Sequence, residues 1–73
     1  MIIKETVYQL IHQQFGEELS FTDETLLKEE LGIDSYKAIN FLYELQNAGI
    51  TLKSYNVDTI KTVGDLIKAL KYE

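Results

Sequence analysis

The chain has 73 residues, a formal net charge of −5 and no cysteine. Residues 1–73 are therefore expected to form a single domain around one core, held together by packing without disulfides. The acidic balance and the lack of any arginine argue against nucleic acid as a partner, because binding to phosphates needs clustered cations. The longest apolar run is only a few residues, which argues against a membrane span.

Helical spacing of apolar residues dominates the sequence, so the expected fold is all-α. A first helix is predicted on a stripe that is apolar except at its last member: Ile3, Val7, Leu10, Ile11 and Gln14. Gly16 should end this helix, because glycine suits the left-handed position after a helix terminus. His12 is the only histidine, and we expect it at the surface or at the boundary of the core rather than as a base or a ligand.

A long loop is predicted over residues 17–33, where no helical period is sustained. A short helical turn is possible within Thr22–Glu30. Apolar residues distributed along the loop should hold it against the helices: Phe21, Leu26, Leu27, Leu31 and Ile33.

A second helix is predicted from about Ser35 to about Ala48. Gly32 allows a sharp turn before it, and Asp34 or Ser35 can cap its first turn. The apolar stripe of this helix is expected to comprise Ile39, Leu42, Leu45 and Ala48.

The last third of the chain predicts two short elements before a last helix. Residues 50–52 alternate like a strand, but three residues without a partner cannot form a sheet, so we expect an extended link with Ile50 and Leu52 facing the core. A short third helix is predicted over residues 54–60, with Ser54 as its cap, and as the shortest helix it should be the most able to move. Its apolar residues would be Tyr55, Val57 and Ile60.

A fourth helix should begin at Thr62, because Thr62 and Asp65 have the spacing of a capping box. Its last turn should contain Lys68 and Lys71, where cations interact well with the helix dipole. The apolar stripe expected on this helix comprises Val63, Leu66, Ile67 and Leu70.

The start of the second helix is the candidate site. It places the Ser35 hydroxyl where unpaired backbone N–H groups and the helix dipole favour a phosphate. No Ser-His-acid set, cysteine nucleophile or phosphate-binding glycine loop accompanies it, so Ser35 is expected to be modified by another protein rather than to catalyse. The simplest alternative is an ordinary helix cap, and another is a small enzyme that uses His12 with nearby acids.

Negative charge is concentrated just before this site. Residues 21–35 sum to −4, although the whole chain sums to −5. The run is either a solvated loop or a docking field for basic partner proteins. Its acidic members are Asp23, Glu24, Glu29, Glu30 and Asp34.

The segment Leu-Gly-Ile-Asp-Ser at residues 31–35, followed by a helix, resembles the attachment motif Leu-Gly-x-Asp-Ser-Leu of the acyl carrier protein family. Residues 60–63, Ile-Lys-Thr-Val, are close to that family's Ile-Thr-Thr-Val. The resemblance covers nearly the whole chain. It implies a four-helix bundle with three longer helices, one short third helix and a long first loop.

The resemblance also implies a function. Ser35 would bear a 4′-phosphopantetheine arm, which a separate transferase adds from coenzyme A with magnesium, and Asp34 would assist through that magnesium. The arm would carry acyl or aminoacyl thioesters to loading and processing enzymes of a fatty-acid-like, polyketide or other biosynthetic pathway. The chain itself would be a monomeric carrier and not an enzyme. Apart from the resemblance, the N-terminus lacks the cationic start and apolar block of a signal peptide, so a cytoplasmic protein is expected, and its own Met1 favours a free-standing protein.

Two residue sets follow from the resemblance. The expected docking residues are Glu29, Glu30, Asp34, Tyr36 and Glu44. The expected lining of an acyl pocket is Phe41, Leu42, Leu45, Ile50, Leu52, Ile60 and Leu66.

The sequence also departs from the family pattern. Tyr36 stands where a leucine or methionine usually follows the serine, and Lys37 and Asn40 stand where fatty-acid carriers usually have acids. The turn at residues 46–49 is one residue shorter than usual. These departures favour a specialised pathway, polyketide or aminoacyl, although the peptidyl-carrier signature Gly-Gly-His-Ser is absent. The alternative is a helical interaction module with an unmodified Ser35.

Overall fold

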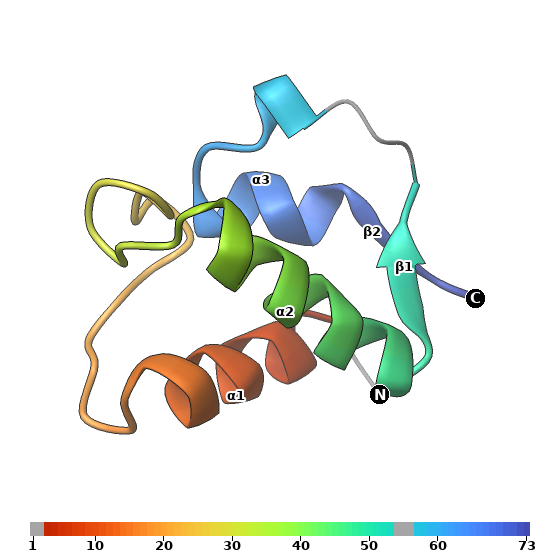
Figure 1. The fold of residues 1–73 in the computed structure, drawn as a ribbon, viewed down its shortest axis with the longest axis horizontal. Coiled ribbons are helices and arrows are strands. Elements are labelled where there is room, and N and C mark those ends of the chain that lie inside the picture. The colour runs from red at the N-terminus through yellow and green to blue at the C-terminus, as the bar shows by residue number, and fades with distance from the viewer. Residues whose placement is uncertain (1–2, 54–56) are drawn as a thin grey trace.

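The computed structural model describes residues 3–53 and 57–73. In these ranges the chain forms the helices α1 (Ile3–Phe15), α2 (Ser35–Asn47) and α3 (Val63–Lys68), the 3-10 turn η1 (Val57–Thr59), and the strands β1 (Ile50–Leu52) and β2 (Leu70–Tyr72). Both α2 and α3 contact α1. The strands β1 and β2 lie side by side at the end of the molecule where the chain terminates (Figure 1). The mostly helical expectation is confirmed, and none of the helices in the described ranges is long and apolar enough to cross a membrane.

A two-stranded antiparallel sheet corrects the all-α prediction. Ile50 lies opposite Tyr72, and Leu52 opposite Leu70. The expectation that residues 50–52 have no partner is wrong, because the partner strand was assigned to the end of the last helix. That helix ends at Lys68, where the N–H of Ala69 closes it on the carbonyls of Asp65 and Leu66, and residues 70–72 then pair with β1.

The four-helix bundle is not confirmed. The predicted third helix is represented by the 3-10 turn η1 at Val57–Thr59, and its proposed cap Ser54 and Tyr55 lie outside the described residues. By contrast, the capping box at Thr62 and Asp65 is confirmed, since each side chain accepts a hydrogen bond from the other residue's backbone N–H. The backbone N–H groups of Lys61 and Thr62 hold the pKa of the Asp65 carboxyl below its ordinary value.

The apolar core lies between the inward-facing sides of the helices α1 to α3 and the two strands. Ile50 and Leu52 face it as predicted, but the predicted stripe of α2 is wrong in part. Ile39 is 66% exposed and Ala48 is exposed, whereas Phe41 is buried and stacks on Phe15 of α1. The buried apolar residues of the core are Val7, Ile11, Phe41, Leu45, Ile50, Leu52, Val63, Leu66 and Leu70.

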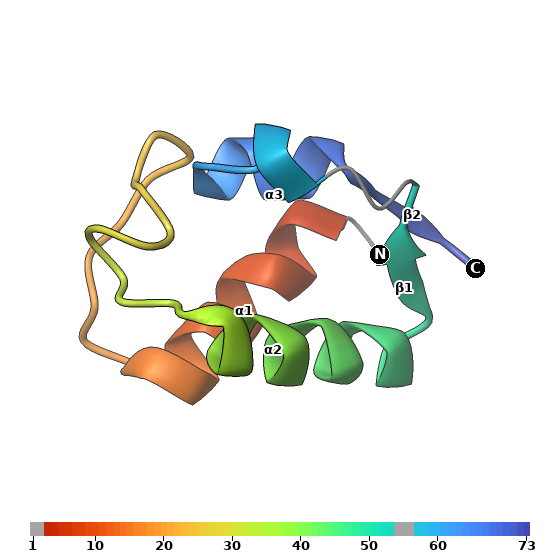
Figure 2. The ribbon, with the colours of Figure 1, turned by 45° about the horizontal axis from the view of Figure 1, so that its top comes forward.

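The loop between α1 and α2 lies at the end of the molecule where α2 and α3 both begin (Figure 2). Backbone hydrogen bonds fasten it to α3 and the segment before it: Leu27 N–H donates to Lys61 O (2.9 Å), Val63 N–H to Thr25 O (3.0 Å) and Gly64 N–H to Asp23 O (2.7 Å). Gly64 is needed for this approach, because a Cβ there would lie 3.0 Å from the Asp23 carbonyl oxygen.

Apolar residues also hold the loop, as predicted, and Phe21, Leu27, Leu31 and Ile33 are half-buried. Leu26 is the exception, since it is 36% exposed. A single helical turn is present within the loop, where Glu30 N–H donates to Leu26 O.

A second set of contacts fastens the loop to α1. The Tyr8 hydroxyl donates to Asp23 Oδ1 (2.5 Å), and Lys4 Nζ lies 3.2 Å from Asp23 Oδ2. The hydrogen bond from Tyr8 is the main reason that the pKa of Asp23 lies below its ordinary value, and it raises the pKa of Tyr8 to about 12. His12 Nε2 donates to Leu19 O (3.0 Å), and its ring lies 5.0 Å from that of Phe21.

Candidate functional site

The first turn of α2 presents Ser35. Gly32 turns the chain toward it with a φ of +69°, and Asp34 then caps the helix, its Oδ1 accepting a hydrogen bond from Lys37 N–H (2.9 Å). Of the two candidate caps, it is therefore Asp34 that caps the helix. Ser35 is the first helical residue and is exposed. Its hydroxyl is not needed for capping, because Asp34 fills that role.

His12 lies at the boundary of the core, as predicted. It is half-buried on α1, and its Nε2–H is committed to the carbonyl of Leu19. Through this hydrogen bond, His12 fastens the beginning of the loop to α1. Among the described residues, no group of three or more histidines and acids could hold a metal ion.

The acidic residues before Ser35 divide into two groups. Three of them stabilise the fold: Asp23 accepts from Tyr8, Glu30 Oε2 accepts from Leu26 N–H (2.8 Å), and Asp34 caps α2. Glu24 and Glu29 are exposed on the loop. The sequence pattern had indicated one negatively charged docking region made of all five residues. It did not predict that Asp23, Glu30 and Asp34 stabilise the fold.

Glu44 and Tyr36, the docking residues predicted on α2, are both exposed. Tyr36 is 74% exposed and is followed at helical spacing by Ile39 and by Tyr43, which is 67% exposed. The three side chains form an outward apolar stripe on α2. Sequence reasoning missed it because Ile39 had been assigned to the core.

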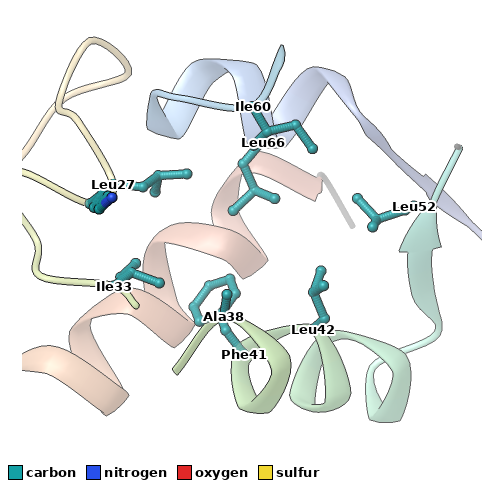
Figure 3. Close-up of a pocket in the computed structure, with 9 residues that line it drawn as sticks. Leu27, Ile33, Ala38, Phe41, Leu42, Leu52, Ile60 and Leu66 are labelled. Carbon is teal, nitrogen blue, oxygen red and sulfur yellow. The ribbon is translucent and has the colours of Figure 1, made fainter. Parts of the chain in front are cut away.

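An apolar cavity of about 170 Å³ lies on the inner side of α2. Leu42 of α2 and Leu66 of α3 point toward each other across it (Figure 3). Of the predicted lining, Leu45 and Ile50 do not border the cavity, and both are fully buried in the core. The residues that line the cavity are Leu27, Lys28, Ile33, Ala38, Phe41, Leu42, Leu52, Ile60 and Leu66.

Four of these lining residues were missed in the sequence: Leu27, Lys28, Ile33 and Ala38. Leu27 and Ile33 were recognised only as anchors of the loop. Both are apolar residues between exposed neighbours on a loop that leads into α2. This pattern could have predicted that they face α2. Lys28 carried no such signal, since it is an exposed, charged residue.

Ser35 and the cavity share one side of α2. Residues 35, 38 and 42 are separated by three and four positions, which places them on one side of a helix. Ala38 and Leu42 line the cavity, and so does Ile33, two residues before Ser35. A group attached to the Ser35 hydroxyl would therefore start beside the cavity and not on the outward stripe.

Residues 5–70 match the sequence model of a protein family described as "Phosphopantetheine attachment site". The matched range includes α2, α3, the loop, all of α1 except its first two residues, and all residues that line the cavity. No solved structure matches the chain significantly.

Proposed function

The chain belongs to the phosphopantetheine attachment site family, and from this premise we propose that Ser35 bears the 4′-phosphopantetheine arm. The protein would be a carrier that presents acyl or aminoacyl intermediates to the enzymes of a biosynthetic pathway. When bound, the arm supplies a thiol that holds the cargo as a thioester.

The observation that carries the proposal is the exposed Ser35 residue at the start of α2. Asp34 takes the capping role, so modification of Ser35 would leave the helix start intact. The backbone N–H groups of Ser35 and Tyr36 belong to the first turn and have no partners within the helix. Together with the helix dipole they favour the negative charge of a phosphodiester on Ser35.

Asp34 has a second proposed role, which is to assist the transferase complex through its magnesium ion. Replacement by asparagine separates this role from capping, because asparagine is also a strong N-cap residue. We expect Asp34→Asn to keep its thermal stability and to be modified more slowly. An unchanged rate of modification would show that the negative charge is not used.

The partner enzymes are proposed to dock on the exposed surface that surrounds Ser35. Tyr36 adjoins the attachment residue, and Glu29, Glu30, Asp34 and Glu44 supply negative charge. If the charges steer docking, the association rate with a cognate enzyme should fall as salt rises. A rate that is independent of salt would assign docking to the apolar side chains, Tyr36 foremost.

The test of the attachment site is a modification assay. The purified chain is incubated with coenzyme A, magnesium and a promiscuous phosphopantetheinyl transferase, and intact mass is measured. The wild type and Ser20→Ala, which changes another exposed serine, should gain the mass of one arm, whereas Ser35→Ala should gain none. No gain on the wild type would leave an unmodified helical interaction module, and an equal gain on Ser35→Ala would place the arm elsewhere.

A further inference from the structure

A polar hollow lies where α2 adjoins the end of α1. It has a volume of about 360 Å³ and is lined by Gln14 and Phe15 of α1, Leu31 of the loop, and Lys37 and Asn40 of α2. We propose that this hollow receives the carboxylate of an aspartate or glutamate from a partner enzyme that acts on Ser35. The inference rests on the proposed attachment of the arm to Ser35 and names the kind of surface that such a partner presents.

Lys37 gives the hollow a positive charge, although the whole chain carries −5. Among the described residues, no acid lines the hollow and none forms an ion pair with the Lys37 ammonium. Asp34 accepts a hydrogen bond from the Lys37 backbone N–H at the helix start. The negative end of α1 and the positive end of α2 both lie here, and their partial charges, about half a unit each, oppose one another. The full charge of Lys37 therefore makes the hollow attractive to an anion.

The lining also matches an acidic side chain in its chemistry and size. A carboxylate accepts hydrogen bonds, and the side chains of Gln14 and Asn40 each offer an NH2 group that bonds to no other described residue. Phe15 and Leu31 supply apolar surface for the methylene groups of the same side chain. A cavity of about 150 Å³ holds benzene, so a hollow of about 360 Å³ has room for a glutamate side chain.

The hollow lies at the edge of the surface that an enzyme covers when it reaches Ser35 over the outward stripe of α2. A helix turns by about 100° per residue, so the residues of the stripe lie about 40–100° around α2 from Ser35. Asn40 and Lys37 follow in the same direction at about 140–200°. The hollow is therefore about one helix width, 10–12 Å, from the attachment residue, with the stripe between them. At such an edge a charge pair contributes to discrimination between partners more than to affinity.

The experiment uses two phosphopantetheinyl transferases, one with acidic and one with basic side chains beside its active-site entrance. Modification is followed by intact mass on the wild type, on Lys37→Glu, and on Lys71→Glu, which makes the same change of charge on β2 at the other end of the molecule (Figure 1). With the acidic transferase, Lys37→Glu should raise KM about tenfold and leave kcat unchanged, whereas with the basic one it should lower KM. Lys71→Glu should change either KM by less than about twofold. Equal effects of the two variants would overturn the proposal, because only the net charge would then matter.

An exchange of charges tests the pairing directly. Each acid beside the entrance of the acidic transferase is replaced in turn by lysine. One of these replacements should weaken the action of the enzyme on the wild type and restore its action on Lys37→Glu, because the pair is then re-formed with opposite signs. If no replacement restores the action on Lys37→Glu, the proposed contact does not exist.

Binding is also measured without modification, on Ser35→Ala. The side-chain amide NMR signals of Gln14 and Asn40 should shift when the acidic transferase is added, but not when sodium acetate is added at the same concentration. Equal shifts with acetate would indicate a site for free anions, and no shift with the transferase would show that its acid does not enter the hollow, so either result overturns the proposal. Failure of the mass gain on the wild type, with these shifts retained, would instead refute the attachment to Ser35.

Discussion

α2 has two inward sides, one toward α1 and one toward the loop and α3, and they are packed differently. Toward α1 and Ile50, the first residue of β1, the packing is tight, and Val7, Ile11, Leu45 and Ile50 have no exposed surface. Toward the loop and α3, half-buried side chains such as Leu42 surround a cavity of about 170 Å³. One helix thus separates a region suited to stability from a region suited to binding.

The difference shows how a domain of 73 residues without disulfides can contain a cavity. A chain of this length buries a modest fraction of its surface, so most of its stability must come from the residues that are packed completely. The cavity side loses dispersion contacts wherever a lining atom faces empty space. An apolar group that fills the space would restore these contacts.

The largest predicted effect contrasts the two sides directly. Ile11→Ala and Leu42→Ala each remove three carbon atoms. Because Ile11 is fully buried, its truncation should lower the free energy of unfolding by about 2–5 kcal/mol. Leu42 borders empty space, so its truncation should cost about 1–2 kcal/mol. Urea unfolding followed by circular dichroism measures both values, and equal losses would contradict the division into a packed and a loose side.

A smaller effect is predicted where the loop closes the cavity side. Gly64→Ala places a Cβ 3.0 Å from the carbonyl oxygen of Asp23, and backbone atoms cannot move aside as a side chain can. The loop or α3 must shift, at a cost of about 1–3 kcal/mol in the free energy of unfolding. Hydrogen exchange should show faster opening of the Leu27 and Gly64 amides than of the Leu45 amide. Uniform protection across the three would show that the loop is not held by this approach.

The smallest predicted effect concerns pH and the fastening of the loop to α1. Since the folded state raises the pKa of Tyr8 from 10.0 to about 12, the stabilisation from its neutral form is complete below pH 10 and is lost as the pH rises toward 12. The pKa of Asp23 is lowered, so its stabilisation is complete above its ordinary value of 3.8 and is lost as the pH falls below it.

Tyr8→Phe tests this assignment. The variant should show a weaker decline of melting temperature at alkaline pH and a slightly weaker decline at acidic pH, where Asp65 of the capping box still contributes. Tyr43→Phe is the control, because Tyr43 is an exposed tyrosine on the outward stripe of α2. If both variants change the pH profile equally, the hydrogen bond to Asp23 is not the source of the alkaline decline.

Local chemistry made part of the fold predictable. The stripe of α1, the loop held by apolar residues and the capping box at Thr62 and Asp65 each follow from residues close together in the chain. The candidate site was predictable for the same reason, since Asp34 and Ser35 define a helix start by themselves. Periodicity could not decide which of two adjacent stripes of α2 is buried, because both Ile39 and Phe41 belong to helical patterns.

The sequence by itself determined where helices begin, which hydroxyl lies at the start of α2, and the family to which the chain belongs. Tertiary structure alone decided that Leu70–Tyr72 leaves the helix to pair with Ile50–Leu52, and that Leu27 and Ile33 complete a cavity next to Ser35. The physical reason is the distance along the chain between the residues that interact. Caps and stripes depend on neighbours within a few residues, whereas strand pairing and an unfilled volume depend on segments that only the packed chain brings together.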